Sequence, residues 1–192
     1  MSTAPEVISS EINGIDLPRL QQTIELIQAQ PALAAFEFQL ANRWLDGPRT
    51  RSTFRSYFGA GQTHQHAAPL DLSTDEPPVL LGTDRHANAG EYLMHALAAC
   101  VTSAIVYHAA ARGIAIEKIE STLEGDVDLR GFLGLDPSVR NGFQEMRMKL
   151  KIKANVPDAQ LQEICELGPK FSPVFDSVTK GLPVHVSAER LA

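Results

Sequence analysis

Cysteine and the familiar catalytic motifs are scarce or missing in this chain of 192 residues. Its two cysteines are too few for a disulfide scaffold or a cysteine-rich zinc site. The chain has no HExxH or CxxC metal motif, no GxGxxG or Walker A phosphate loop, and no GxSxG nucleophile elbow. His64 and His66 would share one side of a strand, but a metal site normally needs three or four ligands. We therefore expect no metal, no cofactor and no serine-hydrolase chemistry.

Basic residues are also fewer than acidic residues, and the formal net charge is −6. An acidic balance argues against a general nucleic-acid-binding surface. Residues 1–13 lack the basic stretch and apolar run of a signal peptide, so we expect a cytoplasmic protein. With 44% hydrophobic residues, the chain is long enough to bury a real core in one good-sized domain or two small ones.

The longest apolar stretch, Tyr92 to Ala111, predicts a buried core helix and no membrane span. It contains His95, Thr102, Ser103 and His108, which would be costly in lipid. We place this helix at about residues 89–112.

The sequence has a start signal at one end of this helix and a stop signal at the other. Asn88 is a suitable N-cap, and Glu91 follows three residues later, as in a capping box. Gly113 is a suitable C-terminal stop. Because small and apolar residues lie nearly all round the helix, we expect it to be covered on most sides, with help from a second subunit.

Two long alternating segments follow, at 119–129 and 145–154. The first places acidic residues between its apolar positions, and the second places Arg147 and lysines there. Paired antiparallel, they would set opposite charges across from each other, as a solvated sheet face and not as a binding site.

The remaining segments predict short elements. A helix follows the N-cap Asp16 and ends at Pro31, and strands at 36–40 and 54–58 form a hairpin around the turn at 46–48. Short strands are predicted at 70–72 and 79–81. A helix that starts at Pro157 is expected to break at Gly168-Pro169. Ser172 is expected to cap a short helix that runs to about Val178. We expect a last strand that contains Leu182, Val184 and Val186.

Three side chains have the chemistry of a site. Cys100 lies midway along the long apolar helix, Cys165 on an apolar helix face, and Ser172 at a helix start. Each has a structural alternative, because unpaired cysteines are often simply buried and serine is a common cap. A disulfide between Cys100 and Cys165 would need Cα atoms within about 7 Å.

Four segments together resemble the OsmC/Ohr family of osmotically inducible and organic-hydroperoxide-resistance proteins. They are Asn88–Cys100, Ala109–Ile114, Thr122–Asp128 and Phe171–Phe175, and the resemblance covers roughly residues 50–188. It implies an α+β fold in which antiparallel sheets of two intertwined subunits wrap long central helices. We accordingly divide the chain into an N-terminal extension, 1–48, with a helix and a strand, and an OsmC-like domain, 49–192.

The resemblance also implies a thiol peroxidase site. A first cysteine attacks the peroxide and becomes a sulfenic acid, and a second cysteine resolves it as a disulfide. Cys100 matches the first cysteine, but Ser172 stands where the second is usual, as in a divergent branch. The family's catalytic acid would fall at Gly90, but the acidic residue of this chain is Glu91. A shift of one residue along a helix turns the side chain by about 100° around the helix axis. The family's arginine corresponds to Arg51, Arg55 or Arg85, among which the sequence does not choose.

Two functions follow as expectations. The first is a peroxidase that reduces organic hydroperoxides through Cys100, with Ser172 and Glu91 at the site and either Cys165 or an external thiol reductant as resolver. The alternative is a non-catalytic dimer that binds a small apolar ligand. Both assume a homodimer with no nucleic acid or membrane partner.

Overall fold

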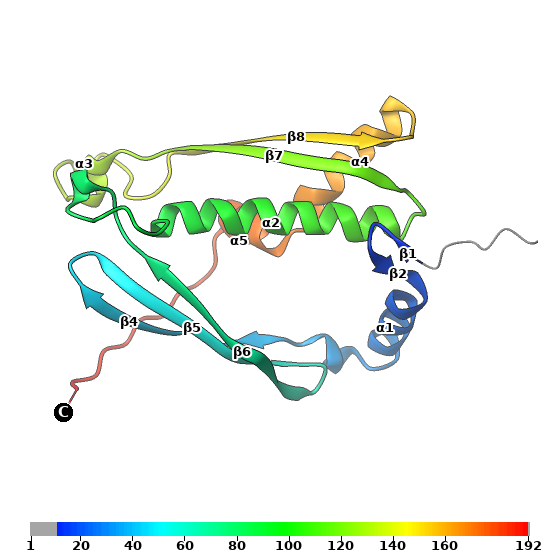
Figure 1. Ribbon diagram of the computed structural model, residues 1–192, viewed down its shortest axis with the longest axis horizontal. Helices are drawn as coiled ribbons and strands as arrows, with labels where there is room; N and C mark the ends of the chain where they lie inside the picture. Colours follow the sequence, from blue (N-terminus) through cyan, green and yellow to red (C-terminus); the bar gives the residue numbers. More distant parts are fainter. Residues whose placement is uncertain (1–10, 192) are drawn as a thin grey trace, which may run out of the picture. The chain divides into compact units, whose positions relative to one another are not determined.

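The computed structural model describes residues 11–191, and these fall into two compact units divided between Leu93 and Met94. Figure 1 shows the course of the chain through both units. Each unit is described by itself below. The domain boundary expected near residue 48 stays a prediction.

The first unit is a small antiparallel sheet with a helix at its N-terminal end. β5 is its central strand, with β6 paired along one edge and β3 and β4 paired in succession along the other. Its elements are β1 (Glu11–Ile12), β2 (Ile15–Asp16), α1 (Leu17–Ala29), the 3-10 turn η1 (Pro31–Ala34), β3 (Glu37–Phe38), β4 (Ala41–Asp46), β5 (Arg49–Gly59), β6 (Gln62–Thr74) and the 3-10 turn η2 (Pro78–Leu80).

Local signals in this unit act as predicted. The backbone N–H of Arg19 donates to Asp16 Oδ1 at 3.0 Å, which caps α1. The turn between β4 and β5 contains Gly47, whose φ of 46° favours glycine. The strand expected at 70–72 is part of β6, but the strand expected at 79–81 is wrong. Pro77 and Pro78 lack N–H donors, and the chain makes the η2 turn there instead.

The loop after β6 is organised by the fully buried carboxylate of Asp75. Asp75 Oδ1 accepts the Glu76 N–H at 2.8 Å, and Oδ2 accepts the Thr83 hydroxyl at 2.6 Å and the Arg85 N–H at 3.2 Å. The Thr83 N–H is shared between both oxygens at 3.2 Å. The Thr83 hydroxyl and these N–H groups hold the pKa of Asp75 well below its usual range, despite the opposing effect of burial.

The Asp75 hydrogen bonds predict a pH-dependent stability. A lowered folded-state pKa stabilises the fold at pH values above the ordinary carboxyl pKa of about 3.9, and this contribution disappears as the pH falls below it. We expect Asp75→Asn to lower the urea midpoint of unfolding at pH 7, and the difference from wild type to shrink between about pH 5 and pH 2. A difference that stays constant across that range would contradict this account.

The second unit packs helices against one long hairpin (Figure 1). α2 enters it from the first unit, β7 and β8 pair antiparallel, and α2 runs lengthwise along them. The elements are α2 (Ala89–Ala110), β7 (Ile116–Asp126), α3 (Leu129–Phe132), β8 (Glu145–Ala154), α4 (Asp158–Phe171) and α5 (Pro173–Lys180).

The expected pairing of acidic with basic positions across β7 and β8 is confirmed. Glu120 lies opposite Lys151, and Glu124 lies opposite Arg147, which also pairs with Asp126. On the opposite face of the hairpin, apolar residues such as Leu123 pack against the core. The alternation therefore sets both the register and the buried face.

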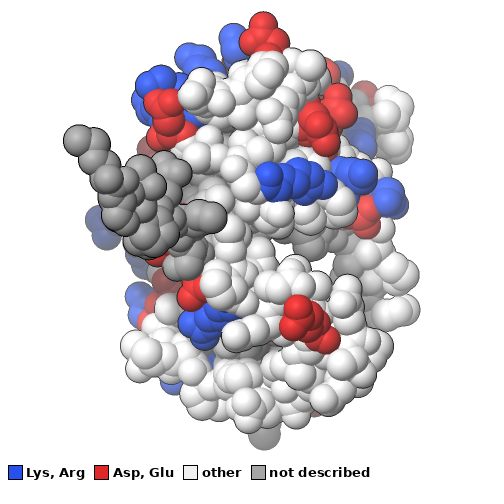
Figure 2. Space-filling view, turned by 90° about the vertical axis from the view of Figure 1, so that its right-hand side faces the viewer, with Lys and Arg blue, Asp and Glu red and all other residues white. Residues whose placement is uncertain are grey.

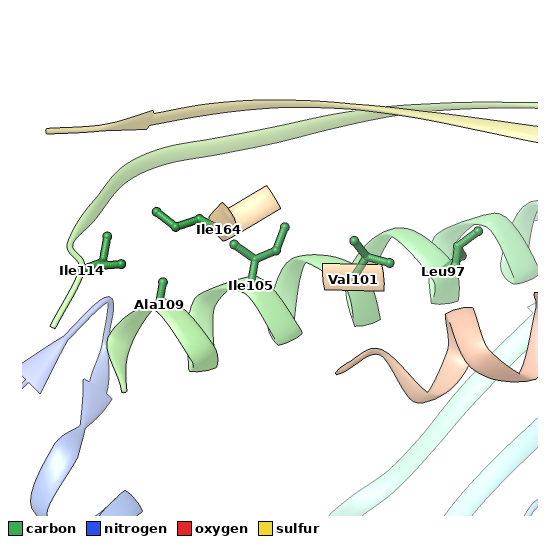
Figure 3. Close-up of a cluster of buried hydrophobic side chains, with 6 residues drawn as sticks. All are labelled: Leu97, Val101, Ile105, Ala109, Ile114 and Ile164. Atoms are coloured by element: carbon green, nitrogen blue, oxygen red, sulfur yellow. The ribbon is translucent and has the colours of Figure 1, made fainter. Parts of the chain in front are cut away.

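One stripe of α2 forms the core of this unit. Leu97, Val101, Ile105 and Ala109 follow one another at a spacing of four residues, and all are buried with Ile114 and Ile164 (Figure 3). Within residues 11–191, α2 is the one helix long and apolar enough to cross a membrane by length and composition. Its packing in this cluster is that of a core helix.

Two predictions for the C-terminal part are wrong. α4 does not break at Gly168-Pro169 but continues to Phe171. Gly168 removes one of the clashes that a proline causes, because it has no Cβ to meet the proline ring. Residues 182–186 form no strand. Leu182, Val184 and Val186 alternate as a strand requires, yet no described segment of the chain pairs with them.

Gly168 also sets how closely α4 approaches α2. A Cβ built there would lie 2.7 Å from Val101 Cγ1 and 3.0 Å from Ile105 Cγ1. We expect Gly168→Ala to lower the free energy of unfolding by about 1–3 kcal/mol, because the core has no room for the methyl group.

Gly142→Ala is the matched control, because a Cβ at Gly142 would meet only Arg140 Nε at 3.8 Å. Urea unfolding of both variants measures the difference. Equal effects from the two substitutions would show that the close contact at Gly168 does not limit the packing.

Candidate functional site

Cys100 lies at the border of the core stripe of α2. Its neighbour Val101 is 1% exposed, whereas Cys100 is half-buried and free. Successive helix residues are turned by about 100°, so Cys100 points away from the centre of the stripe. The Cys100 thiol is thus neither part of the buried cluster nor fully exposed.

Cys165 has a comparable place on α4. It follows the buried Ile164, and it is also half-buried and free. Burial raises the pKa of the Cys165 thiol, and the Glu166 carboxylate raises it further. At neutral pH this thiol is therefore protonated and is a weak nucleophile.

The two cysteine-bearing helices meet at Gly168. Val101 and Ile105 of α2 lie against this glycine. Cys100 directly precedes Val101, and Cys165 precedes Gly168 by less than one helical turn. The structure thus brings the two cysteines to the same helix crossing, with no disulfide between them.

Ser172 is 2% exposed and caps α5. Its Oγ accepts the Phe175 N–H at 3.1 Å, as the sequence predicted. Because Oγ acts here as an acceptor, the hydroxyl hydrogen is free to be donated to a neighbouring group.

His108 is a neighbour of this region that the sequence reasoning did not single out. Its ring stacks on Phe171 at 3.8 Å between centroids, directly before Ser172. Burial lowers the pKa of His108, and the positive charges of Arg112 and Lys170 lower it further, so the imidazole is neutral at pH 7. The sequence feature that could have pointed to His108 is its position two helical turns after Cys100 on α2.

Glu91 is engaged in the predicted capping box. Its carboxylate accepts the Asn88 N–H at 2.8 Å, and its own N–H donates to Asn88 Oδ1 at 2.9 Å. Arg51 and Arg55 lie on β5, and Arg85 lies in the loop before α2. All three arginines stay candidates for the arginine that the resemblance implies.

On the face shown in Figure 2, acidic and basic side chains are interspersed. Over residues 11–191, no three His, Cys, Asp or Glu side chains are grouped as metal ligands.

Comparison with known proteins places this arrangement in a family. The model of the OsmC-like protein family matches residues 82–187, which is more than half of the chain. The chain belongs to the OsmC-like protein family. The matched range contains both cysteines, Ser172 and the long apolar helix.

Solved structures show the same α+β fold. An OsmC-like protein from Mycoplasma pneumoniae is similar with 13% identity and a TM-score of 0.56, over 79% of this chain and 94% of that one. A protein of osmotic stress and detoxification response from Psychrobacter arcticus 273-4 has 15% identity and a TM-score of 0.55, over 74% and 88%. No curated protein sequence gives a significant match.

The environment of Cys165 predicts slow alkylation. In a Cys100→Ser background, we expect iodoacetamide to label Cys165 more slowly at pH 8 in the folded protein than in urea. The pH–rate profile should be displaced to higher pH in the folded state, because the folded-state pKa is raised.

A further Glu166→Gln substitution removes the nearby negative charge and should move the profile part of the way back. Identical profiles for folded and unfolded protein would contradict the proposed environment. Peptide mass spectrometry of timed samples measures each rate.

Proposed function

We propose that this protein is a cysteine-dependent peroxidase that reduces organic hydroperoxides through Cys100. The observation that carries the proposal is a free, half-buried thiol on the central helix of an OsmC-like domain. An apolar setting such as the flank of the α2 stripe suits a substrate with an organic tail.

The proposed reaction begins with the Cys100 thiolate. Its sulfur attacks the terminal oxygen of the hydroperoxide, the O–O bond breaks, and the leaving alkoxide takes a proton to become an alcohol. Cys100 is then a sulfenic acid. A second thiol condenses with it, which forms a disulfide and releases water, and a dithiol reductant restores both thiols by exchange.

Ser172 cannot be the resolving group, because a hydroxyl forms no disulfide. Cys165 is the one other thiol of the chain. Its raised pKa makes it a slow resolver at neutral pH, since the thiolate is the attacking form. The mechanism therefore uses either Cys165 or an external thiol, and the buried Ser172 hydroxyl serves as a hydrogen-bond donor near the α2–α4 crossing.

The working form that we propose is a homodimer. α2 is apolar nearly all round, but its buried residues follow mainly one stripe, and Tyr107 on another side is 50% exposed. A second subunit would cover the remaining apolar surface. Light scattering after size-exclusion chromatography tests this directly, with a mass of about twice 20.9 kDa expected.

A second candidate function is the binding of a small apolar ligand without catalysis. The observation in its favour is that Glu91 and Ser172 both serve as helix caps. If neither side chain assists Cys100, the fold keeps its apolar interior but has no peroxidase activity. An unreactive Cys100 in a protein that binds cumyl alcohol saturably would select this function.

The peroxidase proposal predicts that Cys100→Ser abolishes consumption of cumene hydroperoxide in the presence of dithiothreitol. The loss should reach the rate without protein, because the substituted hydroxyl is a far poorer nucleophile than a thiolate. Xylenol-orange detection of the remaining peroxide measures the rate.

Cys165→Ser is the matched control on the neighbouring helix. It should retain turnover with dithiothreitol, because the external dithiol can resolve Cys100. Full activity in Cys100→Ser, or equal loss in both variants, would exclude Cys100 as the peroxide-reducing residue.

A further inference from the structure

A hollow lies in the first unit. It has a volume of about 330 Å³ and is formed between the β4–β5 turn and the loop that follows β6. This size is within the range of small-molecule sites. Its lining includes Pro48 and Arg49 from the turn and Leu81, Gly82, Thr83 and Arg85 from the loop.

The loop side of the hollow is held rigidly. The buried Asp75 carboxylate fixes the backbone at Thr83 and Arg85 through the hydrogen bonds described above. A Cβ at Gly82 would lie 1.7 Å from the Glu76 carbonyl oxygen, so only glycine fits there. Leu81 has a φ of 64°, which is unfavourable for a leucine and indicates a conformation imposed by its surroundings.

The turn side is fixed by an ion pair. Arg49 Nε and Nη2 donate to the two oxygens of Asp46 at 2.6 and 2.8 Å. This bidentate pair occupies the Nε and Nη2 side of the guanidinium, and no group among residues 11–191 accepts a hydrogen bond from Nη1. Asp46 and Asp75 also line the hollow, and their carboxylate oxygens are already engaged with donors of the protein.

Arg85 differs from Arg49 in having no acidic partner. Its backbone N–H is bound to Asp75, but among residues 11–191 no carboxylate pairs with its guanidinium. The lining of the hollow therefore includes two arginines, while its two carboxylates already have donors. A planar anion that accepts two parallel hydrogen bonds matches such a set of donors.

The rim of the hollow adds an apolar component. Leu81 lines it and is 88% exposed. Pro48 contributes a second apolar surface. A ligand with a short alkyl chain would cover this exposed leucine, whereas an inorganic anion would leave it in water.

We propose that this hollow binds a small organic carboxylate with a short alkyl chain, with Arg85 holding the carboxylate and Leu81 contacting the chain. The hollow does not include Cys100, and its occupancy needs no peroxidase turnover. With Arg85 assigned to the carboxylate, Arg51 and Arg55 remain the candidates for the arginine that the resemblance implies.

The test uses the full-length protein, titrated with hexanoate at 0.15 M salt and followed by ¹H–¹⁵N correlation spectra. We expect saturable shifts centred on the amides of Gly82, Thr83 and Arg85. Arg85→Gln should weaken hexanoate binding about tenfold or more, because a charge-assisted pair is lost. Its backbone hydrogen bond to Asp75 is retained, so the loop stays folded and the urea midpoint should be unchanged.

Arg43→Gln is the matched control, since Arg43 is an exposed arginine of β4 that does not line the hollow. It removes the same charge and should change the dissociation constant by less than about twofold, because distant exposed charges are screened at this salt concentration. An equal loss in both variants would show general charge attraction and overturn the proposal.

Leu81→Asn tests the apolar contact, because asparagine tolerates a positive φ. It should weaken hexanoate about threefold or more and leave acetate binding unchanged. Inorganic phosphate is the competing anion. Phosphate binding as tight as that of hexanoate, or the absence of saturable shifts with hexanoate, would overturn the assignment.

Discussion

The packing of one stripe of α2 against β7, β8 and α4 is the constraint on which the second unit depends. Val101 and Ile105 are almost fully buried, and both lie against Gly168 of α4. This contact needs a residue without a side chain on α4, and the same glycine has no Cβ to meet the ring of Pro169. Packing therefore fixes the α2–α4 crossing near which both cysteines lie.

The polar Ser172 lies near this crossing because one helix ends there and the next begins. Ser172 is buried because α5 begins where α4 ends, and a buried helix start needs a capping acceptor. Cys100 is half-buried because it stands next to the core stripe and not within it. The α2–α4 crossing is thus built mainly from apolar side chains, with the polar groups at its border.

Much of the fold was predictable because it depends on local patterns. The capping box of Asn88 and Glu91, the caps Asp16 and Ser172, and the charge pairing of β7 with β8 are all encoded within short segments or at fixed spacing. The errors arise where the outcome depends on distant partners. Residues 182–186 have the period of a strand but no described partner, and Pro169 lies inside α4 although a proline commonly ends a helix.

The candidate site was predictable to a smaller extent. The family motif around the long helix singles out Cys100, because it matches in order and spacing over many residues. Neither the stacking of His108 on Phe171 nor the convergence of a whole loop on Asp75 follows from a motif, since each depends on how segments fold back in space. The choice among Arg51, Arg55 and Arg85 likewise depends on tertiary and subunit contacts that local spacing does not contain.

The most direct test of the central claim is mass spectrometry of the reduced protein after one equivalent of cumene hydroperoxide, with a sulfenic-acid trap present. The account predicts rapid trapping at Cys100 or a disulfide between Cys100 and Cys165. Cys100 that stays unmodified under conditions that oxidise free thiols would contradict it, and the ligand-binding function would then be the better description of this OsmC-like protein.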